Sequence, residues 1–149
     1  MQSHTRLNHA WWTLRIGLGL GALFAGLDKF FNLLTNWGMY LNPIAPRLLH
    51  LSPATFMHIV GVVEIVAGVL VLSRFTCYAA YIVMVWLWAI SLNLITQGMF
   101  LDLAVRDIEI SLGAFALAKL TEVRQEAFQA SGSAADHGVH ESNAVQHHA

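Results

Sequence analysis

The stretch LDLAVRDIEISLGAFALAKL, residues 101–120, decides the fold, because it combines the length and apolar character of a membrane span with four charges. A helix of about 20 residues crosses the roughly 30 Å of hydrocarbon in a bilayer. The charges all lie in the first half of the stretch and are Asp102, Arg106, Asp107 and Glu109. A charge at the centre of a lipid-facing helix costs about 2.5–3.5 kcal/mol. These charges are therefore expected to pair, to face a protein interior, or to be protonated.

The rest of the chain has the composition of an integral membrane protein. Of its 149 residues, 56% are hydrophobic and 11% are charged, whereas about 25% are charged in an average soluble domain. The mean hydropathy is +0.56. The net charge is -1, and no basic run supports a nucleic-acid partner. The single cysteine, Cys77, excludes an internal disulfide and a CxxC redox pair.

Three more apolar runs precede residues 101–120, and the four together predict an all-α, integral membrane, antiparallel four-helix bundle. The predicted spans cover about residues 11–34, 56–73, 77–95 and 101–120. Only SRFT and TQGMF separate the last three runs, and such short connections make neighbouring helices antiparallel. The segment between the first two runs contains three prolines, which forbid a long helix. We expect it to cover the mouth of the bundle as a short helix or an irregular lid.

Two terminal segments flank the membrane domain of residues 11–120. Residues 1–10 form a short N-terminal segment, and residues 121–149 form a C-terminal tail. From Gln125 onward the tail is small, polar and aperiodic, which predicts that it is mostly disordered. Its histidines at positions 137, 140, 147 and 148 are interpreted as part of a solvated tail rather than as a metal site.

The basic residues predict the orientation. The side that carries both termini holds Arg6, Arg15, Arg74, Lys119 and Arg124, and the other side holds Lys29 and Arg47. Positive charge concentrates in cytoplasmic segments, so both termini are predicted to be cytoplasmic.

With this orientation, most charges of the spans fall into one polar layer in the outer half of the bundle. Glu64 and Glu109 are the candidate catalytic groups, as proton exchangers. The candidate binding residues are Arg106, Lys29, Asp107, Asn93 and Arg15. No metal ligands are predicted, and the lone intramembrane histidine His58 argues against a bis-histidine haem. A purely structural role, in which the charges only lock the helices together, is the alternative.

Arg106 is expected to be the hub of this layer. Asp102 lies four residues before it and Glu109 three residues after it, on the same helical face. Glu64 is expected to face Arg106 from the second span. Small residues allow close helix contact in lipid, so the glycine-bearing faces of the first two spans are expected to point inward.

Three motifs resemble the DoxX/DoxD-like family of bacterial membrane proteins. These are LRIGLGLGALFAGLDKF at residues 14–30, VGVVEIVAGVLVLSRFT at residues 60–76, and DLAVRDIEISLGAFAL at residues 102–117. The resemblance covers about residues 11–120, and MYLNP is also similar to a part of the related MauE-type proteins. It implies a four-helix protein of the bacterial inner membrane, and some family members are subunits of quinone-linked oxidoreductases, including thiosulfate:quinone oxidoreductase. By position, the family pattern falls on Arg15, Lys29, Glu64, Arg106 and Asp107.

These observations lead to one main hypothesis and two alternatives. The main hypothesis is a membrane subunit of a redox complex, non-catalytic or quinone-linked, that binds a quinone headgroup or a small anion in the outer-half polar layer. Arg106 and Lys29 would orient the bound oxygens, and Glu64 or Glu109 would exchange the proton. No covalently bound cofactor is predicted. Membrane lipid and a partner redox protein are the expected partners, with homo-oligomerisation left open. The alternatives are a small proton-coupled transporter and a structural membrane anchor or assembly factor.

Overall fold

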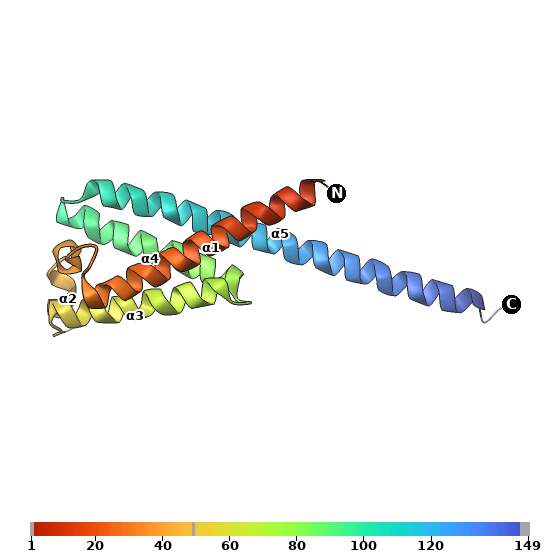
Figure 1. Ribbon diagram of the computed structural model, residues 1–149, viewed down its shortest axis with the longest axis horizontal. Helices are drawn as coiled ribbons and strands as arrows, with labels where there is room; N and C mark the ends of the chain where they lie inside the picture. The colour runs from red at the N-terminus through yellow and green to blue at the C-terminus, as the bar shows by residue number, and fades with distance from the viewer. Residues whose placement is uncertain (1, 49, 147–149) are drawn as a thin grey trace.

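The computed structural model describes the backbone of residues 2–48 and 50–146, and the side chains of residues 5–44, 46, 47 and 50–130 (Figure 1). This part of the chain is helical and contains no strand. The long helices are α1 (Gln2–Phe31), α3 (Pro53–Leu72), α4 (Thr76–Gln97) and α5 (Leu101–Gln146). The 3-10 helix η1 (Trp37–Tyr40) and the short helix α2 (Ile44–Leu48) lie between α1 and α3. The predicted all-α class is therefore confirmed.

Local signals explain where the helices begin and end. Ser52 caps the N-terminus of α3, because its hydroxyl oxygen accepts a hydrogen bond from the Thr55 N–H at 3.1 Å, and Pro53 is the first helical residue. Gly98 ends α4 in the left-handed conformation, with φ of 66°, which a glycine adopts without strain. Consequently α3 and α4 coincide with the second and third predicted spans to within three residues at either end.

The most extensive helix contacts are between α1 and α3 and between α4 and α5. Glycines bring α1 and α3 together. A Cβ atom on Gly61 would lie 2.7 Å from the Gly26 carbonyl oxygen, and one on Gly68 would lie 2.7 Å from the Gly19 carbonyl oxygen. The expectation that these glycine faces point inward is therefore correct. It is wrong for Gly17 and Gly21, because a Cβ atom on either would meet nothing within 4 Å.

The surface of the helices is apolar over much of its length. Large exposed hydrophobic side chains occur on every long helix, for example Phe24, Val69, Ile82 and Leu112. Three helical segments of the described chain are long and apolar enough to cross a membrane, namely Thr5–Phe31, Pro53–Leu72 and Thr76–Gln97. These features are those of a multi-pass membrane protein. The predicted span at residues 101–120 is not among the three, since its four charges interrupt the apolar run.

Helix α5 differs from the prediction in length. It does not end near Leu120 but continues to Gln146, so its second half extends away from the other helices as a single helix (Figure 1). The backbone of residues 125–146 is helical in this structure, and the disorder expected from Gln125 stays a prediction. Alanine is the most frequent residue there and proline is absent, which favours a helix. The tail histidines lie outside the residues with described side chains.

Candidate functional site

A buried ion pair joins α1 and α3. The Lys29 ammonium lies 2.6 Å from the Glu64 carboxylate, and the two side chains are only 5% and 11% exposed. The close contact at Gly26 and Gly61 explains this geometry, because each glycine lies nearly one helical turn before a member of the pair, Gly26 before Lys29 and Gly61 before Glu64. A Cβ atom on Gly61 would also lie 3.1 Å from the Lys29 Cβ atom. The glycines therefore place the two charged side chains directly against each other.

Residues that follow α1 cover this pair from outside. The ring of Trp37 in η1 lies over the Lys29 ammonium, with 3.8 Å between the nitrogen and the ring centroid. Asp28 holds Trp37 there, because its carboxylate accepts a 2.7 Å hydrogen bond from the indole N–H. The same carboxylate accepts hydrogen bonds from the N–H groups of Leu33 and Leu34. Asp28 thus fixes the turn after α1 and the aromatic cover of Lys29.

Helices α4 and α5 complete the surroundings of the pair. Asp107 is buried on α5 and lies close enough to Glu64 and Lys29 to interact electrostatically with both. The indole N–H of Trp86 on α4 is buried near the Glu64 carboxylate, yet it makes no hydrogen bond within the described part of the chain. Lys29, Glu64, Trp86 and Asp107 therefore form a buried polar cluster with one residue from each long helix.

A cavity lies beside Lys29, the one member of the cluster that contributes to its lining. It has a volume of about 230 Å³, and Lys29 lines it together with residues of the turn after α1 and the start of α3. Polar groups in its lining come from Asn32, Asn36 and His58. Binding pockets for drug-sized molecules usually measure about 300–1,000 Å³. A cavity of this size suits a small headgroup or ion, with the Lys29 cation as the charged group of its wall.

The structure brings together only some of the predicted site residues. Lys29, Glu64 and Asp107 meet in the buried polar cluster, as a convergent layer requires. Glu109 is exposed on α5 and lies outside the cluster. Arg15 lies at the opposite end of the bundle, where its guanidinium donates to the carbonyl oxygens of Val71, Leu72 and Ser73 at 3.1, 2.5 and 2.6 Å. Asn93 fastens the outer segment, because its amide donates to the Tyr40 carbonyl at 2.9 Å.

Arg106 is not the hub, which corrects the sequence interpretation. Its side chain is 55% exposed, and its carboxylate partner among the described residues is the adjacent Asp107, at 3.2 Å. The face of α5 that packs inward carries Ala104, Asp107, Ser111 and Ala114, all buried. Ser111 receives a 2.9 Å hydrogen bond from the Trp88 indole, and the Ala104 carbonyl accepts one from Ser91. These contacts turn Asp107 inward and leave Arg106, Asp102 and Glu109 outside.

Sequence reasoning missed two aromatic members of the site. Neither Trp37 nor Trp86 is among the residues that the sequence predicts for the site. A tryptophan a few residues beyond the end of a helix that carries a lysine can lie at the membrane interface or over that lysine. Only the fold could therefore identify the cation–aromatic contact. Among the described residues, no group of three or more His, Cys, Asp or Glu side chains could hold a metal ion.

Comparison of the chain with protein-family models, with curated proteins and with solved structures found no match. The resemblance to DoxX-like proteins therefore depends on the three motifs alone, and the roles assigned to individual residues stay predictions.

Proposed function

We propose that the protein is an antiparallel four-helix protein of the bacterial inner membrane, with α5 as its fourth span. The support for α5 is its contact with α4 along the whole of that apolar helix. Ser91 bonds to Ala104 and Trp88 to Ser111, and further along Cys77 bonds to Ala118 and Tyr81 to Glu122. If α4 crosses the bilayer, α5 lies beside it at the same depth. Its buried charge, Asp107, then faces protein rather than lipid.

In this arrangement the basic residues are sorted between the two ends. The start of α1, the α3–α4 connection and the middle of α5 lie toward one end of the bundle (Figure 1). These segments carry Arg6, Arg15, Arg74, Lys119 and Arg124. Lys29 and Arg47 fall at the other end. The excess supports a cytoplasmic location for the first end. The cavity beside Lys29 then opens toward the outer face of the membrane.

The function that this geometry supports best is a membrane subunit of a redox complex that binds a quinone headgroup or a small anion beside Lys29. The observation that carries the proposal is the buried Lys29–Glu64 pair, whose lysine lines a small cavity. Breaking a buried pair leaves an uncompensated charge, and ionisable groups within a membrane domain are usually functional. The resemblance to DoxX-like proteins, some of which are quinone-linked subunits, points the same way.

The residues of the cluster have distinct proposed roles. The Lys29 ammonium would donate a hydrogen bond to an oxygen atom of the ligand, and the Trp37 ring would close the site above it. Glu64 would take the Lys29 proton or return one when the ligand changes charge. Reduction of a quinone to a quinol consumes two electrons and two protons, and a partner redox protein would supply the electrons. Arg106 and Glu109, which are exposed, are proposed to have no direct part.

The two alternatives are less well supported. A proton-coupled transporter needs exchangeable groups through both halves of the membrane. Among the described residues of the membrane domain, no carboxylate follows Glu64 on α3, and none follows Glu109 on α5 until Glu122, at the opposite end of the bundle. A structural anchor needs no cavity beside the ion pair. The experiment below distinguishes a structural anchor from a ligand-binding subunit.

The test is ligand content after purification in a mild detergent. The parent, Glu64→Gln and Glu109→Gln are compared by mass spectrometry of bound quinones, small anions and co-purifying proteins. Glu109→Gln is the matched control, because it removes the same charge from an exposed position. We expect Glu64→Gln to lose the bound ligand and Glu109→Gln to keep it. Equal ligand content in a folded Glu64→Gln variant would contradict the proposal and favour the anchor.

A further inference from the structure

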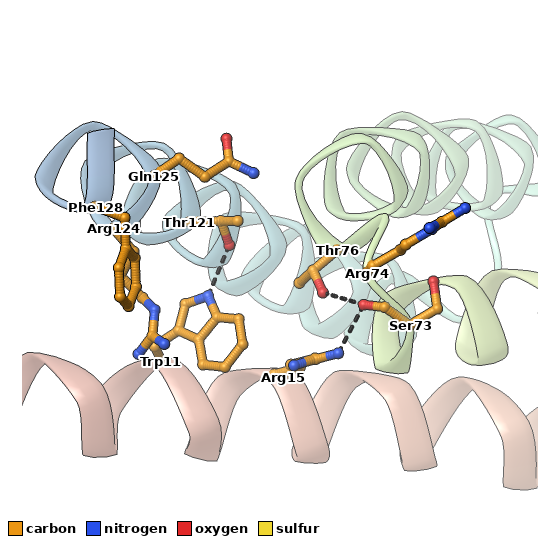
Figure 2. Close-up of a pocket in the computed structure, with 9 residues that line it drawn as sticks. All are labelled: Trp11, Arg15, Ser73, Arg74, Thr76, Thr121, Arg124, Gln125 and Phe128. Atoms are coloured by element: carbon orange, nitrogen blue, oxygen red, sulfur yellow. Dashed lines mark hydrogen bonds between the residues drawn. The ribbon is translucent and has the colours of Figure 1, made fainter. Parts of the chain in front are cut away.

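A second cavity lies at the opposite end of the bundle, far from the buried polar cluster. It measures about 180 Å³, and α1, the α3–α4 connection and α5 all contribute to its lining (Figure 2). At about 30 Å³ per molecule, this is space for roughly six waters. Three arginines line it, one from each contributor: Arg15, Arg74 and Arg124. Its lining contains no acidic residue.

The three positive charges lack carboxylate partners within the described part of the chain. Arg15 and Arg124 lie close enough to repel each other. Both flank Trp11, with their guanidinium carbons 4.7 and 4.2 Å from its ring centroid. The Trp11 indole is itself held by a 2.7 Å hydrogen bond to the Thr121 hydroxyl. Arg15 is held by its hydrogen bonds to the carbonyl oxygens at the end of α3, and Arg124 by a hydrogen bond to the Asn8 side chain. Arg74 also lines the cavity but points away from the other two arginines (Figure 2). The cavity is therefore basic.

Two further features favour an anion in this cavity. Helix α4 begins here at Thr76, and no side chain caps its N-terminus. The positive end of its dipole therefore adds to the arginine charges. The C-terminal carbonyls of α3, which would repel an anion, are occupied by the hydrogen bonds from Arg15. The apolar rings of Trp11 and Phe128 complete the lining.

We propose that this arginine cavity binds the phosphate of an anionic phospholipid from the cytoplasmic leaflet. The inference uses the membrane arrangement proposed above, but not the ligand site at Lys29 and Glu64. Basic cavities between membrane helices on the cytoplasmic side suit acidic headgroups. The rim is where a headgroup would lie, and the exposed apolar surfaces of Leu20 on α1 and Phe75 before α4 offer a path for acyl chains. Free phosphate has the same chemistry at the headgroup but lacks these apolar contacts.

The test measures binding of phosphatidylglycerol to the delipidated full-length protein by native mass spectrometry. Phosphatidylcholine is the neutral control, and inorganic phosphate is added in a separate arm. We expect the parent to prefer phosphatidylglycerol. Arg74→Gln and Arg124→Gln are each expected to weaken its binding about fivefold, the factor expected for one basic residue at an acidic membrane surface. Glu64→Gln, at the other end, is expected to bind the lipid as the parent does.

The matched control is Arg6→Gln, which removes one charge from the same end of α1 without lining the cavity. It should change lipid binding less than twofold. Arg74 is exposed and makes no hydrogen bond recorded among the described residues, so Arg74→Gln stays informative even if Arg124→Gln fails to fold. Equal loss in Arg6→Gln and Arg74→Gln would overturn the proposal, as would equal affinity for the two lipids. Full displacement of phosphatidylglycerol by millimolar inorganic phosphate would also overturn it, in favour of a soluble phosphate ligand.

Discussion

At the scale of single residues, the central feature is that Lys29, and not Arg106, neutralises the buried carboxylate of Glu64. The pair is 2.6 Å apart and lies between two helices that meet through glycines. Both ions lose water on burial, and their attraction offsets that loss only while both are present. Removing either partner should therefore cost far more than removing an exposed ion.

Replacing Lys29 and Arg106 one at a time tests whether the buried cation contributes more stability than the exposed one. Lys29→Ala is expected to lower the free energy of unfolding by about 3–5 kcal/mol, because it leaves Glu64 buried without a partner. Arg106→Ala should cost at most about 1 kcal/mol, since its side chain is 55% exposed. The measurement is denaturant unfolding of both variants in the same detergent. A larger cost for Arg106→Ala would restore Arg106 as the hub.

The sequence could predict that charges converge, but it could not select their partners. Helical spacing correctly places Asp102, Arg106 and Glu109 on one face of the fourth span and Asp107 on another. Which face points inward depends on the contacts of Ala104, Ser111 and Ala114 with α4. Those contacts connect residues on different helices, so a single helical pattern does not contain them.

At the scale of helices, the α1–α3 contact positions the ion pair. It depends on Gly19, Gly26, Gly61 and Gly68, where any side chain would meet backbone or a packed neighbour. The glycine spacing in the sequence predicted that these faces point inward, because small residues allow backbones to approach closely, but it did not predict that the two faces meet each other. The cavity beside Lys29 could not be predicted in this way, since it is shaped by η1 and the turn before it.

Two separate glycine substitutions test the contact between α1 and α3. In Gly61→Ala, the new Cβ atom would lie 2.7 Å from the Gly26 carbonyl oxygen, so the helices must separate and the variant should lose stability. In Gly21→Ala, the new Cβ atom meets nothing within 4 Å, and alanine favours the helix by up to about 1 kcal/mol. The thermal unfolding temperature should therefore fall in Gly61→Ala and stay the same or rise in Gly21→Ala. Equal effects would show that α1 and α3 do not pack through Gly61.

A further element-scale prediction concerns the outer segment. Asn93 and Gln97 both donate hydrogen bonds to the Tyr40 carbonyl, at 2.9 and 2.6 Å, and so tie η1 to α4. Asn93→Ala is expected to loosen this segment and to speed proteolysis between Trp37 and Pro53. Thr96→Ala on the same helix end is the control, because Thr96 contacts the outer segment through a 3.4 Å hydrogen bond from Asn42, and its other hydrogen bond, to the Asn93 carbonyl, stays within α4. Unchanged cleavage in Asn93→Ala would count against an ordering role for Asn93.

At the scale of the whole molecule, the open question is whether α5 crosses the membrane. Its first half packs along α4, yet its charges exclude it from the apolar spans. The sequence predicted the short connections correctly and placed the second and third helices to within three residues, because apolar runs and turn residues are local signals. The continuation of α5 to Gln146 was missed, because a polar tail without an apolar face shows no periodicity.

Fusion reporters distinguish four spans from three. With α5 as the fourth span, a reporter after Ala149 should be active only in the cytoplasm, and one inserted at Gly98 only in the periplasm. With α5 outside the membrane, both reporters would lie on the same side. Periplasmic activity after Ala149 would therefore reject the four-span arrangement and, with it, the shared depth of Asp107 and Glu64.

The most direct test of the account is a double-mutant cycle of Lys29→Met and Glu64→Gln, with unfolding free energy and bound quinone or anion measured on each variant. Each single substitution should cost stability by leaving one partner of a buried pair, and the double substitution should recover most of it. The account predicts that ligand remains absent from all three variants, including the stable double variant. A stable double variant that carries as much ligand as the parent would contradict the central claim and reduce the pair to a structural link between α1 and α3.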